Sequence, residues 1–318
     1  MRILLTGGNG FLGHNLIGAL IDRGHEVQAI VRRPETMKIQ DAHLQVMKGD
    51  FLNYEELRAA ATGCEAIIHA AAATDMALSY DEFARVNVGG SQNVIKVADT
   101  LGIDTIVFIS TANTIGYGTP EKSADENAPM EFPFTESYYA QTKARAEQLF
   151  MDYASSGKHI VILNPGFMLG AFDTKPSSGR LIMSAYRKPI MLTPKGGKCF
   201  IHVKDVAAAA VEALSHGSNG ERYFVGNYNL SLYDFYRLQK KVCGYRQWLI
   251  RLPDWMINGI GCCGDALEKL GLRTQVSLRN TRQLCVMEYY DNAKARRELS
   301  LGQIPLEEAI TDFVRYAF

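Results

Sequence analysis

The chain has 318 residues, of which 47% are hydrophobic and 21% charged, a composition that excludes a disordered or fibrous protein and allows two domains of ordinary size. Its 34 Lys and Arg residues balance 34 Asp and Glu residues. A net charge of zero excludes long-range attraction to nucleic acid or to an anionic membrane and leaves open only a local basic patch.

The first half of the chain alternates short apolar runs with amphipathic stretches. The apolar runs predict strands over Arg2–Thr6, Glu26–Val31, Leu44–Met47, Glu65–His69, Thr105–Ile109 and Ile160–Leu163. The amphipathic stretches predict helices over Phe11–Asp22, Tyr54–Ala61, Asp81–Thr100 and Ser137–Tyr153. This alternation is typical of the α/β class, and we expect a doubly wound parallel sheet, the Rossmann arrangement, over residues 1–165.

The second half does not continue this alternation of strand-like and helix-like stretches. It predicts a smaller, mostly helical substrate lobe over residues 166–318. Amphipathic helices are expected over Ser231–Val242 and Pro305–Phe318, and segments at about 200–226 are expected to return to the core of the first domain. Trp248–Gly261 is rich in large apolar residues, but Arg251 and Pro253 interrupt it and it lacks a basic face. We interpret it as a core or cap helix and expect no contact with a membrane.

The six cysteines predict neither a disulfide framework nor a metal site. They form no Cys-x-x-Cys pair and no spacing to histidine that is typical of zinc. Cys262 and Cys263 are adjacent, which suits buried thiols. Because no apolar run reaches the roughly 18 residues of a membrane span and the N-terminal run is too short for a signal peptide, we expect a reduced, cytoplasmic chain.

A glycine-rich turn joins the first strand to the first helix. The run from Thr6 to Gly13 satisfies Gly-x-Gly-x-x-Gly through Gly8, Gly10 and Gly13, and Gly-x-x-Gly-x-x-Gly through Gly7, Gly10 and Gly13. Such a turn brings the backbone close to a pyrophosphate, which the free N–H groups of the helix N-terminus then bind. The residues Gly7, Gly10, Phe11, Leu12 and Gly13 are therefore predicted to bind a dinucleotide.

The end of the second strand indicates which dinucleotide is bound. An NAD site usually carries Asp or Glu there, whereas this chain has Arg32 and Arg33. A guanidinium suits the 2′-phosphate of NADP. We therefore predict NADP rather than NAD, with Arg32 as the contact.

Tyr139 and Lys143 lie one helical turn apart on a predicted helix that follows the Thr105–Ile109 strand. A nearby ammonium would lower the pKa of the phenol. The same spacing recurs at Tyr236–Lys240 and at Tyr290–Lys294, so the motif alone is weak. Only Tyr139 follows a strand of the dinucleotide-binding half, and we interpret Tyr236 and Tyr290 as packing or surface residues.

These motifs, in this order, resemble the extended short-chain dehydrogenases/reductases, the NAD-dependent epimerase/dehydratase family. The similarity extends through stretches containing Gly49–Leu52, His69–Ala72, Asn87–Val94, Ile109–Thr111, Asn164–Gly166 and Phe200–Val206. Within the family, Val27–Arg33 and Asp291–Leu299 look most like the dihydroflavonol-reductase-like and 3β-hydroxysteroid-dehydrogenase-like branch. The chain departs from the family pattern at Gly116–Gly118 and at Asn164, where arginine is common.

The resemblance implies roles for individual residues. Thr111, Tyr139 and Lys143 would be catalytic, with Thr114 and then Ser110 as alternatives to Thr111. The further cofactor-binding residues that it implies are Asp50, Phe51, Ala70, Ala71, Ala72, Asn87, Tyr139, Lys143, Pro165 and Gly166. His69 and His202 are more readily explained as structural histidines.

The sequence leads to an NADP(H)-dependent oxidoreductase that reduces a carbonyl, or oxidises the alcohol, of a small-molecule substrate by hydride transfer with Tyr139 as general acid or base. A nucleotide-sugar epimerase that retains NAD is the first alternative, and a non-catalytic NADP-binding redox sensor is the second. A dehydratase is disfavoured because Ala112 and Asn113 follow Thr111, and a hydrolase because no Gly-x-Ser-x-Gly elbow surrounds Ser110. Family members often dimerise through the helices at Asp81–Thr100 and Ser137–Tyr153, which predicts a homodimer.

Overall fold

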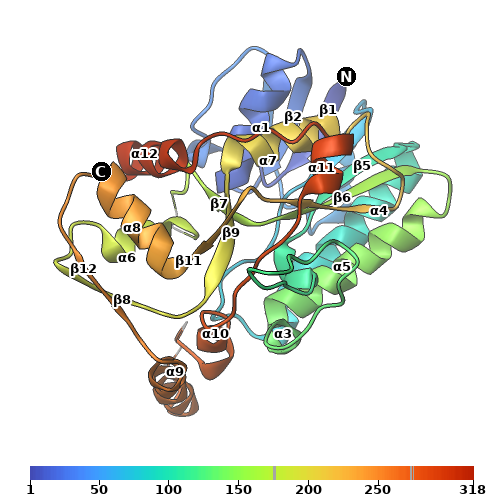
Figure 1. Cartoon of the computed structure of the whole chain (residues 1–318). Helices are drawn as coiled ribbons and strands as arrows, with labels where there is room; N and C mark the ends of the chain where they lie inside the picture. The colour runs from blue at the N-terminus through green and yellow to red at the C-terminus, as the bar shows by residue number, and fades with distance from the viewer. Residues whose placement is uncertain (175–176, 273, 275) are drawn as a thin grey trace.

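The computed structural model describes every residue except 175–176, 273 and 275. Seven parallel strands form one sheet in the order β10-β6-β5-β4-β1-β2-β3. Figure 1 shows the whole chain and labels β1, β2, β5 and β6 of this sheet. The bounds of the seven strands are β1 Arg2–Thr6, β2 Glu26–Val31, β3 Leu44–Lys48, β4 Ala66–His69, β5 Thr105–Ile109, β6 His159–Pro165 and β10 Arg222–Val225. The doubly wound fold is confirmed, and the strand order reverses between β1 and β4, where such sheets bind their ligands.

Helices cover both faces of the sheet because its strands are apolar on both sides. In β1, Ile3 and Leu5 point into one buried cluster, whereas Leu4 points into the other. Helices α1 (Phe11–Asp22) and α7 (Val203–Glu212) close the first cluster. Helices α2 (Tyr54–Ala61), α4 (Gly90–Leu101) and α5 (Tyr138–Ala154) close the second.

The helix that we expected over Asp81–Thr100 is divided by one wide turn. It begins as α3 (Tyr80–Ala84) with Ser79 and Glu82 forming a capping box. A π-helical turn, Arg85–Gly89, then leads into α4. Such turns are frequent at functional sites, and this one carries Asn87.

The second half forms a lobe that contains more strand than the mostly helical one we expected. Strands β7 (Phe167–Leu169), β9 (Gly197–His202) and β11 (Tyr228–Ser231) form a small sheet, and β8 (Ile190–Thr193) pairs with β12 (Trp248–Arg251) in a two-stranded ribbon. The helices of this half other than α7 are α6 Gly179–Ala185, α8 Leu232–Val242, α9 Asp254–Lys269, α10 Leu278–Arg282, α11 Ala293–Glu298 and α12 Leu306–Ala317. Strands this short leave little alternation in the sequence to detect.

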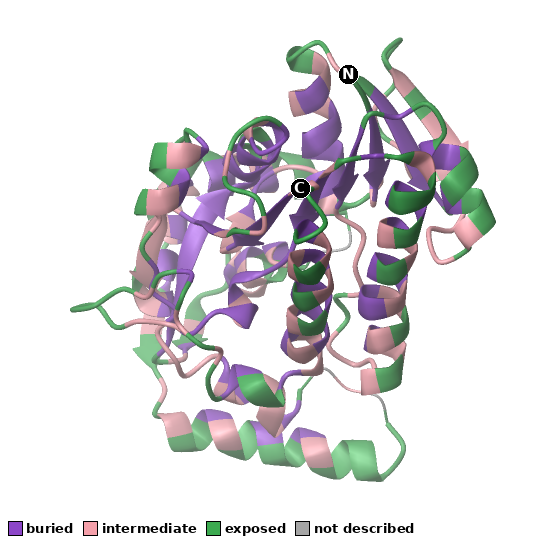
Figure 2. Ribbon diagram, turned by 90° about the vertical axis from the view of Figure 1, so that its right-hand side faces the viewer, coloured by how far each residue is buried: buried purple, intermediate pink, exposed green. Residues whose placement is uncertain are grey.

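The interpretation of Trp248–Gly261 as a single core or cap helix was wrong. Its first residues form strand β12 and the remainder begins helix α9. Trp248 is 78% exposed and Trp255 is 74% exposed. Cys262 and Cys263 are exposed as well, contrary to the buried thiols that we expected. Figure 2 shows this helix, at the lower end of the molecule, as largely exposed.

His69, the last residue of β4, is confirmed as a structural histidine. Its Nδ1 lies 2.7 Å from the Thr6 hydroxyl and its Nε2 lies 3.4 Å from the Ser91 hydroxyl. The ring stacks on Phe108 at a centroid distance of 5.6 Å. Burial lowers its pKa to about 3, with a further contribution from the Lys143 ammonium. The imidazole is therefore neutral in the folded protein at any pH well above 3.

We expect His69 to make the protein sensitive to acid. Because its pKa is about 3 when folded and 6.5 as a model group, the unfolded chain binds one more proton between these values, and stability falls as the pH is lowered through this window. Between pH 7 and pH 4, the wild type should lose about 3 kcal/mol more unfolding free energy than the variant His69→Gln. Denaturant titrations at both pH values measure this difference, and equal losses in the two proteins would contradict it. The exposed His43 provides the control, since His43→Gln should follow the wild type.

Candidate active site

The turn between β1 and α1 requires glycine for steric reasons. Gly7 has a φ of +78°, and a Cβ there would lie 2.8 Å from the backbone nitrogen of Ala71. A Cβ on Gly13 would lie 2.1 Å from the carbonyl oxygen of Gly7. Both distances are shorter than atoms tolerate, so the turn keeps its shape only with these residues.

The N-terminus of α1 fits an anionic group. Gly10 precedes the helix and supplies no side chain to cap it. The first turn of the helix, which begins at Phe11, carries no acidic residue. The first N–H groups of the helix and its partial positive charge are therefore available to phosphates. The predicted diphosphate-binding residues thus form one compact cradle at the carboxyl end of β1.

Arg32 and Arg33 follow directly after β2, which is the neighbour of β1 in the sheet. Both side chains are exposed, and neither forms an ion pair with any residue that the structure describes. The Asn9 amide in the glycine turn donates a 2.8 Å hydrogen bond to the Thr36 hydroxyl. This contact holds the segment after Arg33 beside the glycine turn, so the backbone from which both arginine side chains extend lies near the cradle.

The remaining residues predicted to contact the cofactor lie at the same edge of the sheet. Asp50 follows β3 and accepts a 3.0 Å hydrogen bond from the Leu52 N–H. The Ala71 N–H donates to the Thr6 hydroxyl at 3.2 Å. Asn87 accepts a 2.8 Å hydrogen bond from the Ala73 N–H. The other predicted contacts in these segments and at the end of β6 are Phe51, Ala70, Ala72, Pro165 and Gly166.

Tyr139 lies near the start of α5, and its hydroxyl interacts with the Thr111 side chain, which acts to lower the pKa of the phenol. Burial raises the pKa of Tyr139 to about 12, and the Glu147 carboxylate adds to this, while Thr111 opposes it. We expected Lys143 to lower the pKa of Tyr139. In the folded chain, however, the pKa of Tyr139 is above its ordinary value. The phenol is consequently protonated at neutral pH, which is the state of a proton donor.

Lys143 is directed at the end of β5. Its Nζ donates a 2.7 Å hydrogen bond to the Ile109 carbonyl and lies 4.0 Å from the centroid of the Phe108 ring. Burial lowers the pKa of Lys143 to about 7, against the opposing effect of Glu147. The ammonium is thus fully buried one turn beyond Tyr139 but is hydrogen-bonded to the backbone.

Glu147 is a buried acid that sequence reasoning missed. It stands one further turn along α5, and its Oε1 accepts hydrogen bonds from Thr114 at 2.6 Å and from the Asn164 amide at 2.6 Å. Burial raises its pKa, while its hydrogen-bond donors and Arg222 act in the opposite direction. The regular spacing of Tyr139, Lys143 and Glu147 on one helical face was the available signal.

The hydrogen bonds around Glu147 also help to decide which of Thr111, Thr114 and Ser110 provides the hydroxyl that acts with Tyr139. Thr114 is 3% exposed and hydrogen-bonded to Glu147 and to Asn164, whereas the buried Ser110 hydroxyl forms no hydrogen bond with a described residue. Of the three, only Thr111 acts on the pKa of Tyr139. Asn164, which replaces the common arginine, belongs to the same network.

The two other tyrosines with a following lysine differ from each other. Tyr236 is 2% exposed and packs in the core of the lobe, as expected. Tyr290 is also buried, but it lines a pocket beside Thr111, and its hydroxyl donates to the Ala112 carbonyl at 3.3 Å. We expected both tyrosines to be packing or surface residues and missed the position of Tyr290 in the wall of this pocket.

A pocket of about 270 Å³ opens beside Thr111 and the predicted nicotinamide-side residues Pro165 and Gly166. It is lined mainly by apolar atoms. Its further lining residues include Met76, Asn113, Phe167, Lys198, Cys199, Asn280, Gln283, Leu284, Glu288 and Tyr290. Lys198 and Glu288 form a buried ion pair in this lining, which no sequence pattern indicated. The pocket lies between the sheet and the lobe, where a substrate would meet the predicted catalytic residues.

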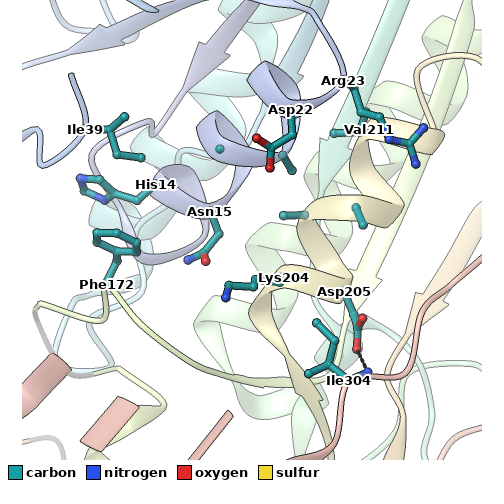
Figure 3. Close-up of a pocket in the computed structure, with 14 residues that line it drawn as sticks. His14, Asn15, Asp22, Arg23, Ile39, Phe172, Lys204, Asp205, Val211 and Ile304 are labelled. Carbon is teal, nitrogen blue, oxygen red and sulfur yellow. Dashed lines mark hydrogen bonds between the residues drawn. The ribbon is translucent and has the colours of Figure 1, made fainter. Parts of the chain in front are cut away.

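A larger cavity, of about 460 Å³, lies elsewhere, between α1 and α7 (Figure 3). Its lining includes His14, which stacks on Phe172, and Lys204 and Asp205. None of the predicted catalytic residues lines it. Proximity to Thr111 therefore favours the smaller pocket as the site of the reaction.

Comparison with known proteins agrees with this geometry. A protein of Synechocystis sp. with the provisional name dihydroflavonol 4-reductase is 30% identical over 98% of this chain and 93% of its own. The 4-hydroxy-2-methyl-3-oxo-4-farnesyl-3,4-dihydroquinoline-1-oxide ketoreductase of Stigmatella aurantiaca is 35% identical over 71% of this chain and 68% of its own. The crystal structure of gox2253 covers 99% of this chain and 97% of its own, with a TM-score of 0.84 and 25% identity.

The family itself follows from a match over most of the chain. Residues 3–226 match the model of the NAD dependent epimerase/dehydratase family. The resemblance to its dihydroflavonol-reductase-like branch is confirmed by the full-length relative. The protein is therefore a member of the NAD-dependent epimerase/dehydratase family and an NAD(P)-dependent oxidoreductase acting on CH–OH or C=O groups.

Proposed function

We propose that the protein is an NADP(H)-dependent reductase that converts the carbonyl group of a small, largely apolar molecule into an alcohol. The observation that carries the proposal is the position of Thr111, which interacts with Tyr139 and lines a pocket whose walls are mainly apolar atoms. Among the relatives, the ketoreductase of Stigmatella aurantiaca supports reduction as the direction. The test is oxidation of NADPH by the purified protein with a panel of apolar ketones, and failure across ketones and aldehydes would overturn the proposal.

In this proposal Tyr139 is the general acid. Its phenol donates a proton to the substrate carbonyl oxygen while the carbonyl carbon receives the hydride, so that one C–H and one O–H bond replace the C=O π bond. Thr111 donates a hydrogen bond to the same oxygen and stabilises its developing negative charge. A pKa of about 12 keeps the Tyr139 proton in place at neutral pH until the oxygen becomes basic.

The cofactor would be held by the cradle described above, with the diphosphate at the Gly7–Gly13 turn and Asp50 near the adenine. Bound NADPH supplies the hydride. Pro165 and Gly166 would line the nicotinamide side, and Lys143 would contact the nicotinamide ribose, as the family resemblance implies. The steric need for glycine at Gly13 and the uncapped N-terminus of α1 support this fit.

The preference for NADP is tested by the variant Arg32→Ala. A charge-assisted hydrogen bond contributes about 1.5–3 kcal/mol, so the dissociation constant for NADPH should rise by about ten- to a hundredfold. The constant for NADH should stay within about twofold, since NADH lacks the phosphate. Fluorescence titration measures both, with the exposed Arg58→Ala as control. Tighter binding of NADH than NADPH by the wild type would overturn the preference.

The alternatives make different predictions. Lys198 is the only cation among the described residues that line the pocket, and Glu288 neutralises it. No unpaired cation in that lining is thus available for the diphosphate of a nucleotide sugar, which disfavours the epimerase. NAD retained through purification would favour it instead. A redox sensor would keep its biological role in the variant Tyr139→Phe.

A further inference from the structure

The ribbon formed by β8 and β12 turns apolar side chains to solvent. Ile190 lies opposite Trp248 and Leu192 lies opposite Ile250 in the parallel pairing, and all four side chains are exposed. Leu249, between two of them, packs against the core of the lobe. Since side chains alternate between the faces of a strand, these four residues share the outward face, which we call the ribbon face.

Helix α9 begins shortly after the ribbon and is also apolar on its outside. The exposed residues of its first 14 positions carry no charge and are Trp255, Met256, Gly259, Ile260, Cys262, Cys263, Ala266 and Leu267. The opposite side packs closely on the chain around α10, because a Cβ on Gly261 would lie 2.2 Å from the Thr281 hydroxyl and one on Gly264 would lie 1.6 Å from the Val276 carbonyl. The ribbon and α9 both lie on the lobe, away from β1 and the N-terminus (Figure 1).

The segments around the ribbon face are strongly basic, although the whole chain has no net charge. Residues 186–197 and 235–253 contain eight Lys and Arg and no Asp or Glu. Six of these cations are exposed and form no ion pair with any described residue, namely Arg187, Lys188, Lys195, Lys241, Arg246 and Arg251. A local basic patch, which the composition left open, therefore surrounds an exposed apolar face.

We propose that the ribbon face and the outer side of α9 dock on the surface of a bilayer that contains anionic phospholipid. Tryptophan and aliphatic side chains enter the boundary between headgroups and acyl chains, and the surrounding Lys and Arg contact the anionic headgroups. The docking is peripheral, because no helix among the described residues is long and apolar enough to span a bilayer. It reverses our expectation from sequence, which placed Trp248 in a core or cap helix.

The charges favour lipid over a second copy of the chain. A symmetric contact through the ribbon face would bring the same basic segments of two copies together, with no acid in either segment to neutralise them. An anionic bilayer supplies the opposite charge. The docked lobe would also hold a wall of the substrate pocket near the lipid, since α10, which packs on α9, contributes Asn280 to that wall.

The test is co-sedimentation of the purified full-length protein with vesicles of phosphatidylcholine alone or mixed with phosphatidylglycerol. We expect binding to the mixed vesicles that weakens at high salt, and little binding to phosphatidylcholine alone. The double variant Trp248→Glu/Ile250→Glu should lower the partition coefficient more than tenfold. Arg246→Ala should lower it about fivefold.

Matched controls distinguish specific vesicle binding by the ribbon face from nonspecific adsorption of the protein. Phe132→Glu changes a side chain of comparable exposure, at 51%, outside the lobe, and Lys122→Ala removes an exposed cation elsewhere, so both should bind as the wild type does. A dissociation constant for NADPH equal to that of the wild type shows that the double variant is folded. Failure of the wild type to bind mixed vesicles, or equal binding by the double variant, would overturn the proposal. So would a dimer in light scattering that the double variant dissociates, because the ribbon face would then join two copies.

Discussion

Replacing Tyr139 with phenylalanine is expected to lower kcat for carbonyl reduction by about 10²–10⁴-fold, the usual contribution of a positioned general acid. The change removes one hydroxyl, while the ring keeps its packing against Phe83 at a centroid distance of 6.0 Å. The dissociation constant for NADPH should stay within a few-fold of the wild type. Steady-state kinetics and a cofactor titration on the same preparation separate these two effects.

The chain supplies a close control for this prediction. Tyr236 is also buried and also precedes a lysine by one helical turn, but it lies on α8 and contacts Ser184 at 3.4 Å. Tyr236→Phe should therefore leave kcat within about twofold of the wild type, since neither Tyr236 nor Ser184 lines the pocket and their hydrogen bond does not enter the reaction. A wild-type kcat in Tyr139→Phe would rule out this phenol as the proton donor.

The variant Lys198→Met should destabilise the protein by about 3–5 kcal/mol. Lys198 and Glu288 are 9% and 5% exposed, and their side chains are in direct contact. Removal of the ammonium leaves a buried carboxylate without its counter-charge, which costs far more than the intact pair contributes. Denaturant titration at neutral pH measures the loss.

The double variant Lys198→Met/Glu288→Leu tests this explanation. Replacing both partners with apolar residues removes the unpaired charge, so most of the lost stability should return. If the double variant is as unstable as the single one, the loss comes from packing and not from an unpaired charge. Because both residues line the substrate pocket, the double variant should also raise KM for any substrate that has a polar group near them.

The glycine turn illustrates what a local pattern can determine. Gly7, Gly10 and Gly13 fall within a single strand–turn–helix unit, so their spacing alone predicted a cradle, and a Cβ at Gly7 or at Gly13 would lie less than 3 Å from backbone atoms. The strands and helices of residues 1–165 were predictable for the same reason, since each buried face repeats with its own period. Their observed bounds differ from the prediction by a few residues at most, apart from the π-helical turn.

The sequence by itself thus determined the α/β fold, the spacing of the glycine turn and the Tyr139–Lys143 pair, because each depends on residues close together in the chain. The candidate Thr111 followed from the family resemblance. Only the tertiary structure decided which partners meet across the fold. Lys198 and Glu288 are separated by 90 positions, Glu147 collects donors from three other segments, and the ribbon face exists only once β8 pairs with β12. Such contacts depend on strand order, register and burial, which become defined only when distant segments of the chain pack together.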